Sequence, residues 1–324
     1  MTTLADIEAA AQRIRGVAVA TPLIKSTVLD DRLGGAVVFK PENLQRTGSF
    51  KIRGAYNLLS QLTPEAARSG AVAWSSGNHA QGVAAAGGML GISTAIAMPE
   101  DAPRAKLENT RRLGGEVITF DRYTGDREEI ARSVAAERGA TIVPSYEHRD
   151  IIAGQGTVGL EIAKDSIASG ELVQQVIIPC GGGGLTSGSA VALRALLPDV
   201  QIYTAEPENY DDTLQSLRSG ERVSVPTDVP SLCDALLTNA PGEMTLDIMQ
   251  DLVTDGFVVS EDEVKAAMRF AFQELKMIVE PGGAAALAAL LAGRLDAKNR
   301  VTAVVLSGGN VDSELFASIQ LDPA

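Results

Sequence analysis

Short apolar runs rich in Val and Ile recur along this chain and alternate with segments whose apolar residues follow helical spacing. A parallel sheet covered by helices on both faces produces this alternation, because its strands are buried on both sides. The runs are residues 37–40, 72–75, 94–98, 116–120, 176–179, 201–205 and 301–306. The pattern predicts an α/β fold with mostly parallel sheets.

Local signals mark two helix starts. Pro103, two residues after Asp101, predicts a helix that runs through Arg112. Ser260 and Glu263 have the spacing of a capping box and predict the start of another helix.

The length of 324 residues suits one large or two interlocked domains. No repeat, low-complexity tract or linker interrupts the pattern, so a second domain is expected to be inserted into the first. We predict a small domain at residues 60–147, inserted in a large domain formed by residues 1–59 and 148–324.

Composition argues against several partners and sites. The net charge of -13, without any basic run, disfavours nucleic acid, and the longest apolar run, residues 284–292, is too short to span a membrane. The first 16 residues lack the pattern of a signal peptide, which predicts a cytoplasmic protein. Two cysteines and two histidines cannot form a disulfide framework or a His-rich metal site.

Lys51 stands two residues after Ser49, a plausible helix N-cap, at the end of the polar stretch 41–48. In the first turn of a helix, the positive end of the dipole favours a neutral amine, which can form a Schiff base with a carbonyl compound. An ordinary surface lysine is the alternative interpretation of this segment.

A glycine run follows the apolar run 176–179 and precedes a segment of helical spacing that begins near Leu185. It consists of Gly181, Gly182, Gly183 and Gly184. Glycines leave backbone N–H groups free to converge on an anion, and the helix N-terminus adds partial positive charge, so the run predicts a phosphate site. No lysine follows as a P-loop requires, and Thr186 breaks a dinucleotide fingerprint. A glycine-rich turn without a ligand remains an alternative.

Two further turns follow predicted strands. The first, residues 75–82, carries polar side chains that could bind a carboxylate or serve as an N-cap, among them Ser75, Ser76, Asn78 and His79. In the second, residues 307–310, Ser307 offers a hydroxyl that can hydrogen-bond a ring nitrogen without protonating it. Each turn alone is equally consistent with a structural role.

Taken in order, these segments resemble the fold-type II enzymes that depend on pyridoxal 5'-phosphate (PLP), specifically the serine/threonine dehydratase and serine racemase family. The resemblance covers nearly the whole chain, through residues 21–23, 40–45, 48–54, 75–82, 152–157, 181–184 and 307–310. It implies the tryptophan synthase β-like fold, with two open, twisted, mostly parallel sheets flanked by helices. It also implies a PLP cofactor, an amino-acid substrate and a homodimer.

The resemblance implies a role for each site residue. Lys51 would carry PLP, Phe50 would pack beside its ring and Asn78 would bond the ring hydroxyl. Ser307 would face the pyridine nitrogen, and the phosphate would be held by Gly181, Gly182, Gly183, Gly184 and Leu185. The substrate α-carboxylate would be received by Ser75, Ser76, Asn78 and His79. Ser76 would lie on the ring face opposite Lys51.

Residues 206–212 resemble the divalent-cation loop of the racemase-like members, with Glu206, the Tyr210 carbonyl and Asp212 as ligands. Ligation by oxygen alone suits Mg²⁺, Mn²⁺ or Ca²⁺. A solvated acidic helix start is the alternative.

The chain departs from the family pattern just before residues 152–157. Many members have a His-Pro-Phe type segment where this chain has residues 144–150, which include Tyr146. His148 and Arg149 there, with Arg127 upstream, could accommodate a second substrate carboxylate, as in 3-hydroxyaspartate. As surface residues they would have no such role.

The resemblance predicts a PLP-dependent ammonia-lyase that eliminates water from threonine, serine or 3-hydroxyaspartate. Lys51 would remove the Cα proton. An alternative is an amino-acid racemase in which Ser76 reprotonates Cα from the opposite face. A non-catalytic protein that binds an amino acid or a nucleotide is a further alternative.

Overall fold

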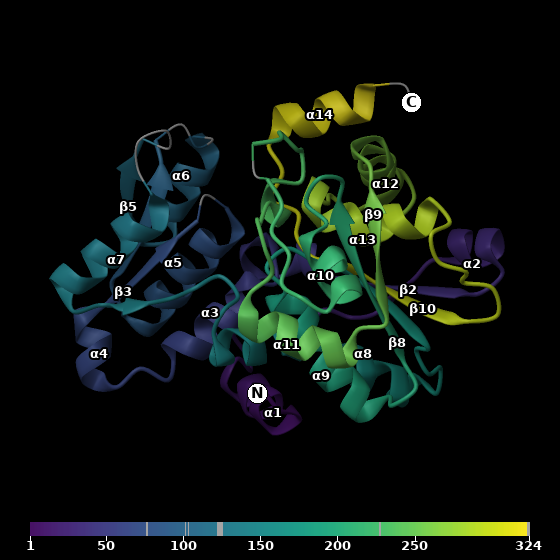
Figure 1. The fold of residues 1–324 in the computed structure, drawn as a ribbon, viewed down its shortest axis with the longest axis horizontal. Coiled ribbons are helices and arrows are strands. Elements are labelled where there is room, and N and C mark those ends of the chain that lie inside the picture. Colours follow the sequence, from purple (N-terminus) through teal and green to yellow (C-terminus); the bar gives the residue numbers. More distant parts are fainter. Residues whose placement is uncertain (76, 101, 103, 122–125, 227, 323–324) are drawn as a thin grey trace.

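The computed structural model describes residues 1–75, 77–100, 102, 104–121, 126–226 and 228–322. Two sheets lie side by side in two lobes, the smaller at the left of Figure 1 and the larger at the right. Helices cover both sheets, as the alternation of apolar runs and helical segments predicts.

The larger sheet has six strands in the order β1-β2-β10-β7-β8-β9. All neighbours are parallel except β1, which pairs antiparallel with β2. The strands are β1 (Ile24–Lys25), β2 (Ala36–Pro41), β7 (Gln175–Pro179), β8 (Gln201–Pro207), β9 (Asp255–Val259) and β10 (Val301–Leu306).

The smaller sheet has four parallel strands in the order β5-β4-β3-β6. They are β3 (Ala71–Trp74), β4 (Thr94–Pro99), β5 (Gly115–Phe120) and β6 (Thr141–Ile142). All four lie within the range 60–147, although the division into domains at these residues stays a prediction. The prediction of two mostly parallel sheets is confirmed.

The α-helices connect the strands or pack on the sheets. They are α1 (Leu4–Arg13), α2 (Thr27–Leu33), α3 (Lys51–Leu59), α4 (Pro64–Ser69), α5 (Asn78–Leu90), α6 (Arg104–Arg112), α7 (Arg127–Arg138), α8 (Arg149–Ser169), α9 (Gly184–Leu196), α10 (Asp212–Ser219), α11 (Glu243–Leu252), α12 (Glu261–Gln273), α13 (Pro281–Leu291) and α14 (Ser313–Leu321). Three short 3-10 helices are η1 (Glu42–Leu44), η2 (Arg46–Gly48) and η3 (Asp234–Leu236).

The helix signals hold in part. The capping box of Ser260 and Glu263 begins α12 as predicted. Helix α6 ends at Arg112 as predicted, while Asp101 and Pro103 lie outside the described residues. The prediction of Ser49 as the N-cap of α3 is wrong, because Phe50 occupies that position. The Ser49 side chain is buried and has no partner in the described chain.

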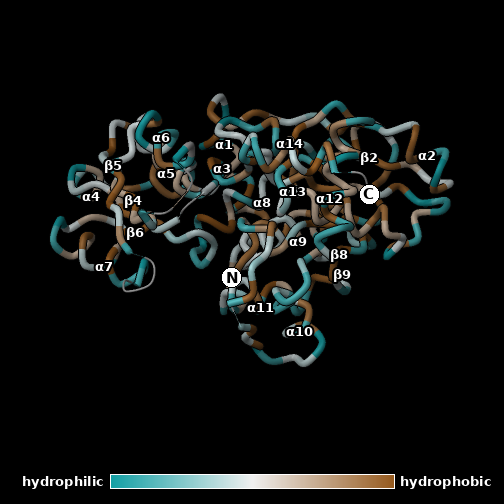
Figure 2. The backbone as a smooth tube through the Cα atoms, turned by 90° about the horizontal axis from the view of Figure 1, so that it is seen from above, coloured by the Kyte–Doolittle hydropathy of each residue, from teal (hydrophilic) through white to brown (hydrophobic). Residues whose placement is uncertain are grey.

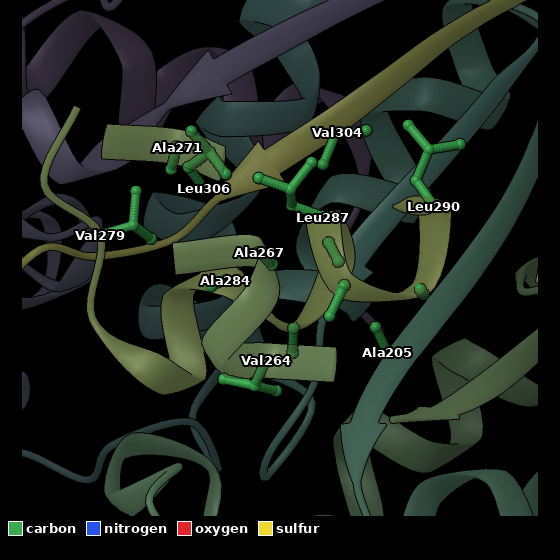
Figure 3. Packing of buried hydrophobic residues seen from close by; sticks show 14 of the residues in the cluster. Ala205, Val264, Ala267, Ala271, Val279, Ala284, Leu287, Leu290, Val304 and Leu306 are labelled. Carbon is green, nitrogen blue, oxygen red and sulfur yellow. The ribbon is translucent and has the colours of Figure 1, made fainter. Parts of the chain in front are cut away.

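Helix α13 forms the centre of the larger core. It contains residues 284–291 of the apolar run in the sequence, and its residues from Pro281 to Leu290 are buried. In Figure 3 Leu287 and Leu290 lie beside Val304 of β10. Figure 2 shows hydrophilic residues, in teal, concentrated in loops at the periphery. Among the described residues, no helix has both the length and the apolar character needed to cross a membrane.

Candidate active site

One cavity of about 710 Å³ is lined by residues of both lobes. It gathers most of the predicted site residues: Phe50, Lys51, Ser75, Asn78, His79, Arg127, Tyr146, Gly181, Gly182, Gly183, Gly184, Leu185, Tyr210 and Ser307. Ser76 lies outside the described residues. Segments far apart in the sequence meet here because each follows a strand whose carboxyl end faces the same side of its sheet.

Lys51 is the first residue of α3 and is half-buried in the cavity wall. Its Nζ donates a hydrogen bond of 3.0 Å to the Ser145 carbonyl oxygen and lies 5.2 Å from the centre of the Phe50 ring. No carboxylate of the described chain forms an ion pair with it. Burial lowers the pKa of Lys51 to about 8, so desolvation favours the neutral amine expected at this position.

The loop that contains Ser307 holds the start of α3. The backbone N–H of Phe50 donates to the Ser307 carbonyl oxygen at 3.3 Å, and Ser49 pairs with Gly308 in an isolated bridge. The position of Lys51 therefore depends on the turn that follows β10.

The glycine run joins β7 to α9. The carbonyl oxygens of Gly181 and Gly182 accept hydrogen bonds from the hydroxyls of Thr213 and Thr245, at 3.4 and 2.7 Å. Within the described chain, no backbone N–H from Gly181 to Leu185 donates a hydrogen bond. These free donors and the N-terminus of α9 face one cavity, and that arrangement can bind a phosphate.

Close packing excludes side chains from the same run. A Cβ added at Gly182 would lie 2.3 Å from Cδ1 of Tyr146. At Gly183, where φ is +89°, an added Cβ would lie 2.6 Å from Cε of Met249 and 2.7 Å from Oγ1 of Thr245. The run therefore needs glycine for conformation and for space.

Asn78 and His79 begin α5 and have fixed orientations. Asn78 Nδ2 donates to Glu280 Oε1 at 2.6 Å, and Asn78 Oδ1 accepts from Asn310 Nδ2 at 2.7 Å. His79 Nε2 lies 2.8 Å from the Val143 carbonyl oxygen. Burial lowers the pKa of His79 to about 3, so the ring is neutral and Nε2 is the donor.

Glu280 was not predicted as a site residue. It lines the cavity, and burial raises its pKa to about 7. In the sequence it precedes Pro281 at the start of α13, and a helix start explains it sufficiently. Its contact with Asn78 crosses 202 positions of the chain, a distance that no local signal reports.

The segment before α8 forms a wall of the cavity. Tyr146 packs on the glycine run, and burial raises its pKa while the positive charge of Arg127 opposes the rise. His148 and Arg149 are engaged elsewhere. His148 is the N-cap of α8, and Arg149 pairs with Asp6 at 2.7 Å. Neither is among the described residues that line the cavity, so their suggested approach to a substrate is not supported.

Glu206 and Asp212 lie outside the cavity lining, near the start of α10. The two carboxylate oxygens of Glu206 accept from the backbone N–H groups of Thr213 and Leu214, at 2.9 and 2.8 Å. Both carboxylate oxygens of Asp212 are buried and have no hydrogen-bond partner of ordinary geometry in the described chain. Burial raises the pKa of both acids, that of Asp212 to about 7.

Tyr210 lies between these two acids in the sequence and is buried. Its hydroxyl donates a hydrogen bond to the Val229 carbonyl oxygen at 2.6 Å. No cluster of three or more His, Cys, Asp and Glu side chains suited to a metal occurs in the described part of the chain. The predicted set differs from such a cluster because it joins two carboxylates to one backbone carbonyl.

Residues 14–308 match the family described as pyridoxal-phosphate dependent enzyme. The chain belongs to this family. An L-threo-3-hydroxyaspartate ammonia-lyase of a Pseudomonas species is 43% identical, with 97% of each chain covered. The catabolic L-threonine dehydratase of Escherichia coli K12 is 40% identical and covers 97% of this chain and 94% of the relative. The structure of maize serine racemase has a TM-score of 0.92 at 35% identity and covers 98% of this chain and 96% of that one.

Membership in the family confirms the predicted fold type and makes this protein a PLP-dependent enzyme. The residues present fit that cofactor. A loop too crowded for side chains offers N–H groups to a phosphate, and a lysine lies in the same cavity; within the described chain, these N–H groups donate no hydrogen bond and the lysine has no acid partner. The alternatives of a dinucleotide site and of a non-catalytic binding protein are set aside.

Proposed function

We propose that this protein is a PLP-dependent ammonia-lyase that converts a β-hydroxy-α-amino acid to a 2-oxo acid and ammonia. The observation that carries the proposal is the half-buried amine of Lys51, which has no acid partner in the described chain, in one cavity with a glycine loop whose described N–H groups are free. The similarity to ammonia-lyases over nearly the full chain supports this chemistry. The candidate substrates are 3-hydroxyaspartate, threonine and serine.

The cavity would hold PLP by its two ends. The free N–H groups from Gly181 to Leu185 would bind the phosphate, and Lys51 would bind the aldehyde carbon. Phe50 would pack beside the ring, Asn78 would reach the ring hydroxyl, and Ser307 would face the ring nitrogen. When bound, PLP supplies an electron sink that stabilises negative charge at the substrate Cα.

Lys51 would take the proton from Cα. With a pKa of about 8, roughly a tenth of such amines are neutral at pH 7, compared with fewer than one in a thousand for an exposed lysine. Loss of the β-hydroxyl as water would leave an enamine. Its tautomer, an imine, takes up water again and yields the 2-oxo acid and ammonia.

The turn at residues 75–79 would hold the substrate α-carboxylate, with Ser75, Ser76, Asn78 and His79 as its members. Arg127 and Tyr146 would face a second carboxylate, as in 3-hydroxyaspartate. Both line the cavity, and the charge of Arg127 is close enough to affect Tyr146.

The test is release of ammonia and 2-oxo acid from L-threo-3-hydroxyaspartate, threonine and serine by the PLP-loaded protein. Lys51→Ala should abolish turnover and covalent PLP, which is seen as loss of visible absorbance. If the variant kept both, the assignment of Lys51 would be wrong. Strong preference for the dicarboxylic substrate would support the roles of Arg127 and Tyr146.

Racemisation is a second candidate, and the similarity to maize serine racemase favours it. It would require a proton donor on the opposite face of the ring, for which we propose Ser76. Formation of the D-isomer should be measured beside ammonia release in the wild type and in Ser76→Ala. Racemisation that Ser76→Ala leaves unchanged would contradict this role.

We further propose a divalent cation, Mg²⁺, Mn²⁺ or Ca²⁺, at Glu206, Asp212 and the Tyr210 carbonyl oxygen. The buried carboxylate of Asp212, which has no hydrogen-bond partner of ordinary geometry in the described chain, supports this site. A buried acid without a hydrogen bond is costly unless it is neutral or bound to a cation. The ion would stabilise the start of α10, behind the glycine run.

We also propose that the protein is a cytoplasmic homodimer. Its two cysteines are free and buried, which agrees with a reducing compartment. The exposed side chains of Leu44 and Ile278 lie on segments joined by a hydrogen bond from Asn43 to Ile278, and such an apolar surface suits self-association. Sedimentation of the purified protein tests the oligomeric state.

A further inference from the structure

Lys106 and Asp234 form an ion pair across the cavity. Lys106 belongs to α6 beside the smaller sheet, and Asp234 begins η3, whose Leu236 packs on Gly181. The lysine side chain is 15% exposed and the aspartate side chain 47% exposed. Neither residue has a role in the chemistry described above.

The position of Lys106 suggests a ligand for its charge. A Cβ added at Gly77 would lie 3.9 Å from Lys106 Nζ, so the ammonium stands beside the turn at residues 75–79. The described side chains of that turn are neutral, since His79 is uncharged. A carboxylate bound there would receive neutral donors from the turn but no full positive charge.

Three cations line the cavity in the described part of the chain: Lys51, Lys106 and Arg127. Lys51 is committed to PLP, and Arg127 lies close to Tyr146. Lys106 is therefore the cation next to the turn.

We propose that Lys106 binds the substrate α-carboxylate and that Asp234 holds the ammonium in place until the substrate arrives. The inference rests on the proposed function, because it assumes an amino-acid substrate in this cavity. The half-exposed carboxylate of Asp234 can be rehydrated when its partner leaves, so the exchange costs little. A carboxylate held by backbone N–H groups would gain a charge-assisted bond.

The experiment compares two non-eliminating ligands that differ in the carboxylate. L-Alanine has an α-carboxylate, whereas L-alaninamide replaces it with a neutral amide. Trp74, the single tryptophan of the chain, lines the cavity, so its fluorescence reports binding without turnover. The PLP-loaded wild type is compared with Lys106→Met, Lys106→Arg and Asp234→Asn.

Lys106→Met should lower the affinity for L-alanine about tenfold or more, as expected for a lost bond between charged groups. The affinity for L-alaninamide should change less than about twofold. Lys106→Arg keeps the charge and should stay within about threefold of the wild type. Asp234→Asn removes the carboxylate that competes with the ligand for Lys106 and should raise the affinity for L-alanine about threefold. Substitution of the two partners of the ion pair should thus have opposite effects on L-alanine binding.

A pair that merely joins the lobes would give another pattern. Lys106→Met and Asp234→Asn would then lower the affinities for L-alanine and L-alaninamide by similar factors, and this result would overturn the proposal. Unchanged binding of L-alanine in Lys106→Met, or no binding to the wild type, would overturn it as well. A wild type that binds L-alanine through Lys106 but releases no ammonia would refute the lyase function and leave Lys106 as the carboxylate ligand.

Discussion

Asn78 donates a hydrogen bond of 2.6 Å to Glu280, and so joins the first turn of α5 to the residue that precedes α13. Asn310 holds the other end of the same amide, at 2.7 Å. The Asn78 side chain is thus oriented from two sides by residues more than 200 positions away. A buried acid that precedes a helix in the sequence thus orients a side chain of the candidate active site.

Glu280→Gln should increase the stability of the protein relative to the wild type more at pH 8 than at pH 5. Burial raises the pKa of Glu280 from 4.5 to about 7, so between these values the unfolded chain loses its proton first and stability falls as pH rises. Glutamine removes this effect and can still accept from Asn78. The free energies of unfolding of the PLP-free wild type and variant are measured by urea denaturation at pH 5 and pH 8. From pH 5 to pH 8 the variant should gain up to about 3 kcal/mol over the wild type. An identical difference at both pH values would contradict the raised pKa.

Covalent uptake of PLP should follow the titration of Lys51. The neutral amine is the nucleophile, so the uptake rate of the PLP-free protein should rise with pH and level off above about 8. Nα-acetyllysine, with an amine near pKa 10.4, provides the matched comparison and should still gain rate well above pH 8. Coinciding pH profiles would show that burial does not lower the pKa of Lys51.

Gly182→Ala should weaken PLP binding about tenfold or more, because the added methyl group collides with the Tyr146 ring at 2.3 Å and displaces the loop. Gly182→Ala/Tyr146→Ala removes the obstructing ring and should bind PLP within about threefold of Tyr146→Ala alone. The dissociation constant of PLP, measured by absorbance titration, tests both. Failure of the double variant to recover would mean that the methyl group, not the collision, blocks the phosphate.

Arg53→Met should destabilise the protein by about 3–5 kcal/mol, since it leaves the buried carboxylate of Glu42 without its positive partner. Arg53 lies two positions after Lys51 and also forms an ion pair with Glu161 at 2.7 Å. The same change should therefore loosen the start of α3. Arg104→Met is the control, because its pair with Glu108 is exposed. The urea midpoint should fall in the first variant and barely move in the second. Equal midpoints would exclude a structural role for the buried pair.

Divalent cations should raise the melting temperature of the wild type by about 5 °C at a concentration 100 times the dissociation constant. Asp212→Asn should lose most of this response, because the buried carboxylate of Asp212 has no hydrogen-bond partner of ordinary geometry among the described residues. Asp211→Asn is the matched control, since Asp211 bonds Gln215 on α10 and should keep the response. A response of equal size in Asp212→Asn would show that Asp212 does not bind the cation.

Local patterns were sufficient for the elements with strong signals. The long, apolar strands β2, β4, β5, β7, β8 and β10 were predicted within two residues at each end, and so was the capped start of α12. Strand β9 was missed because Asp255 and Gly256 open it and it lies half-exposed at the sheet edge, so it has no continuous apolar run. The start of α3 was misplaced by one residue, since Ser49 is drawn into a bridge with Gly308 rather than into a cap.

The sequence alone indicated the type of fold through its apolar runs, and the cofactor through the resemblance of its motifs to a known family. It also predicted Lys51 as the lysine that would carry the cofactor, because each of these signals lies within a few residues. Tertiary structure decided which residues contact one another. The pairing of Asn78 with Glu280, of Lys106 with Asp234 and of Tyr146 with the glycine run joins segments separated by tens to hundreds of positions. Such contacts arise when strands of two sheets bring their ends together, and burial then shifts the protonation of the groups they enclose.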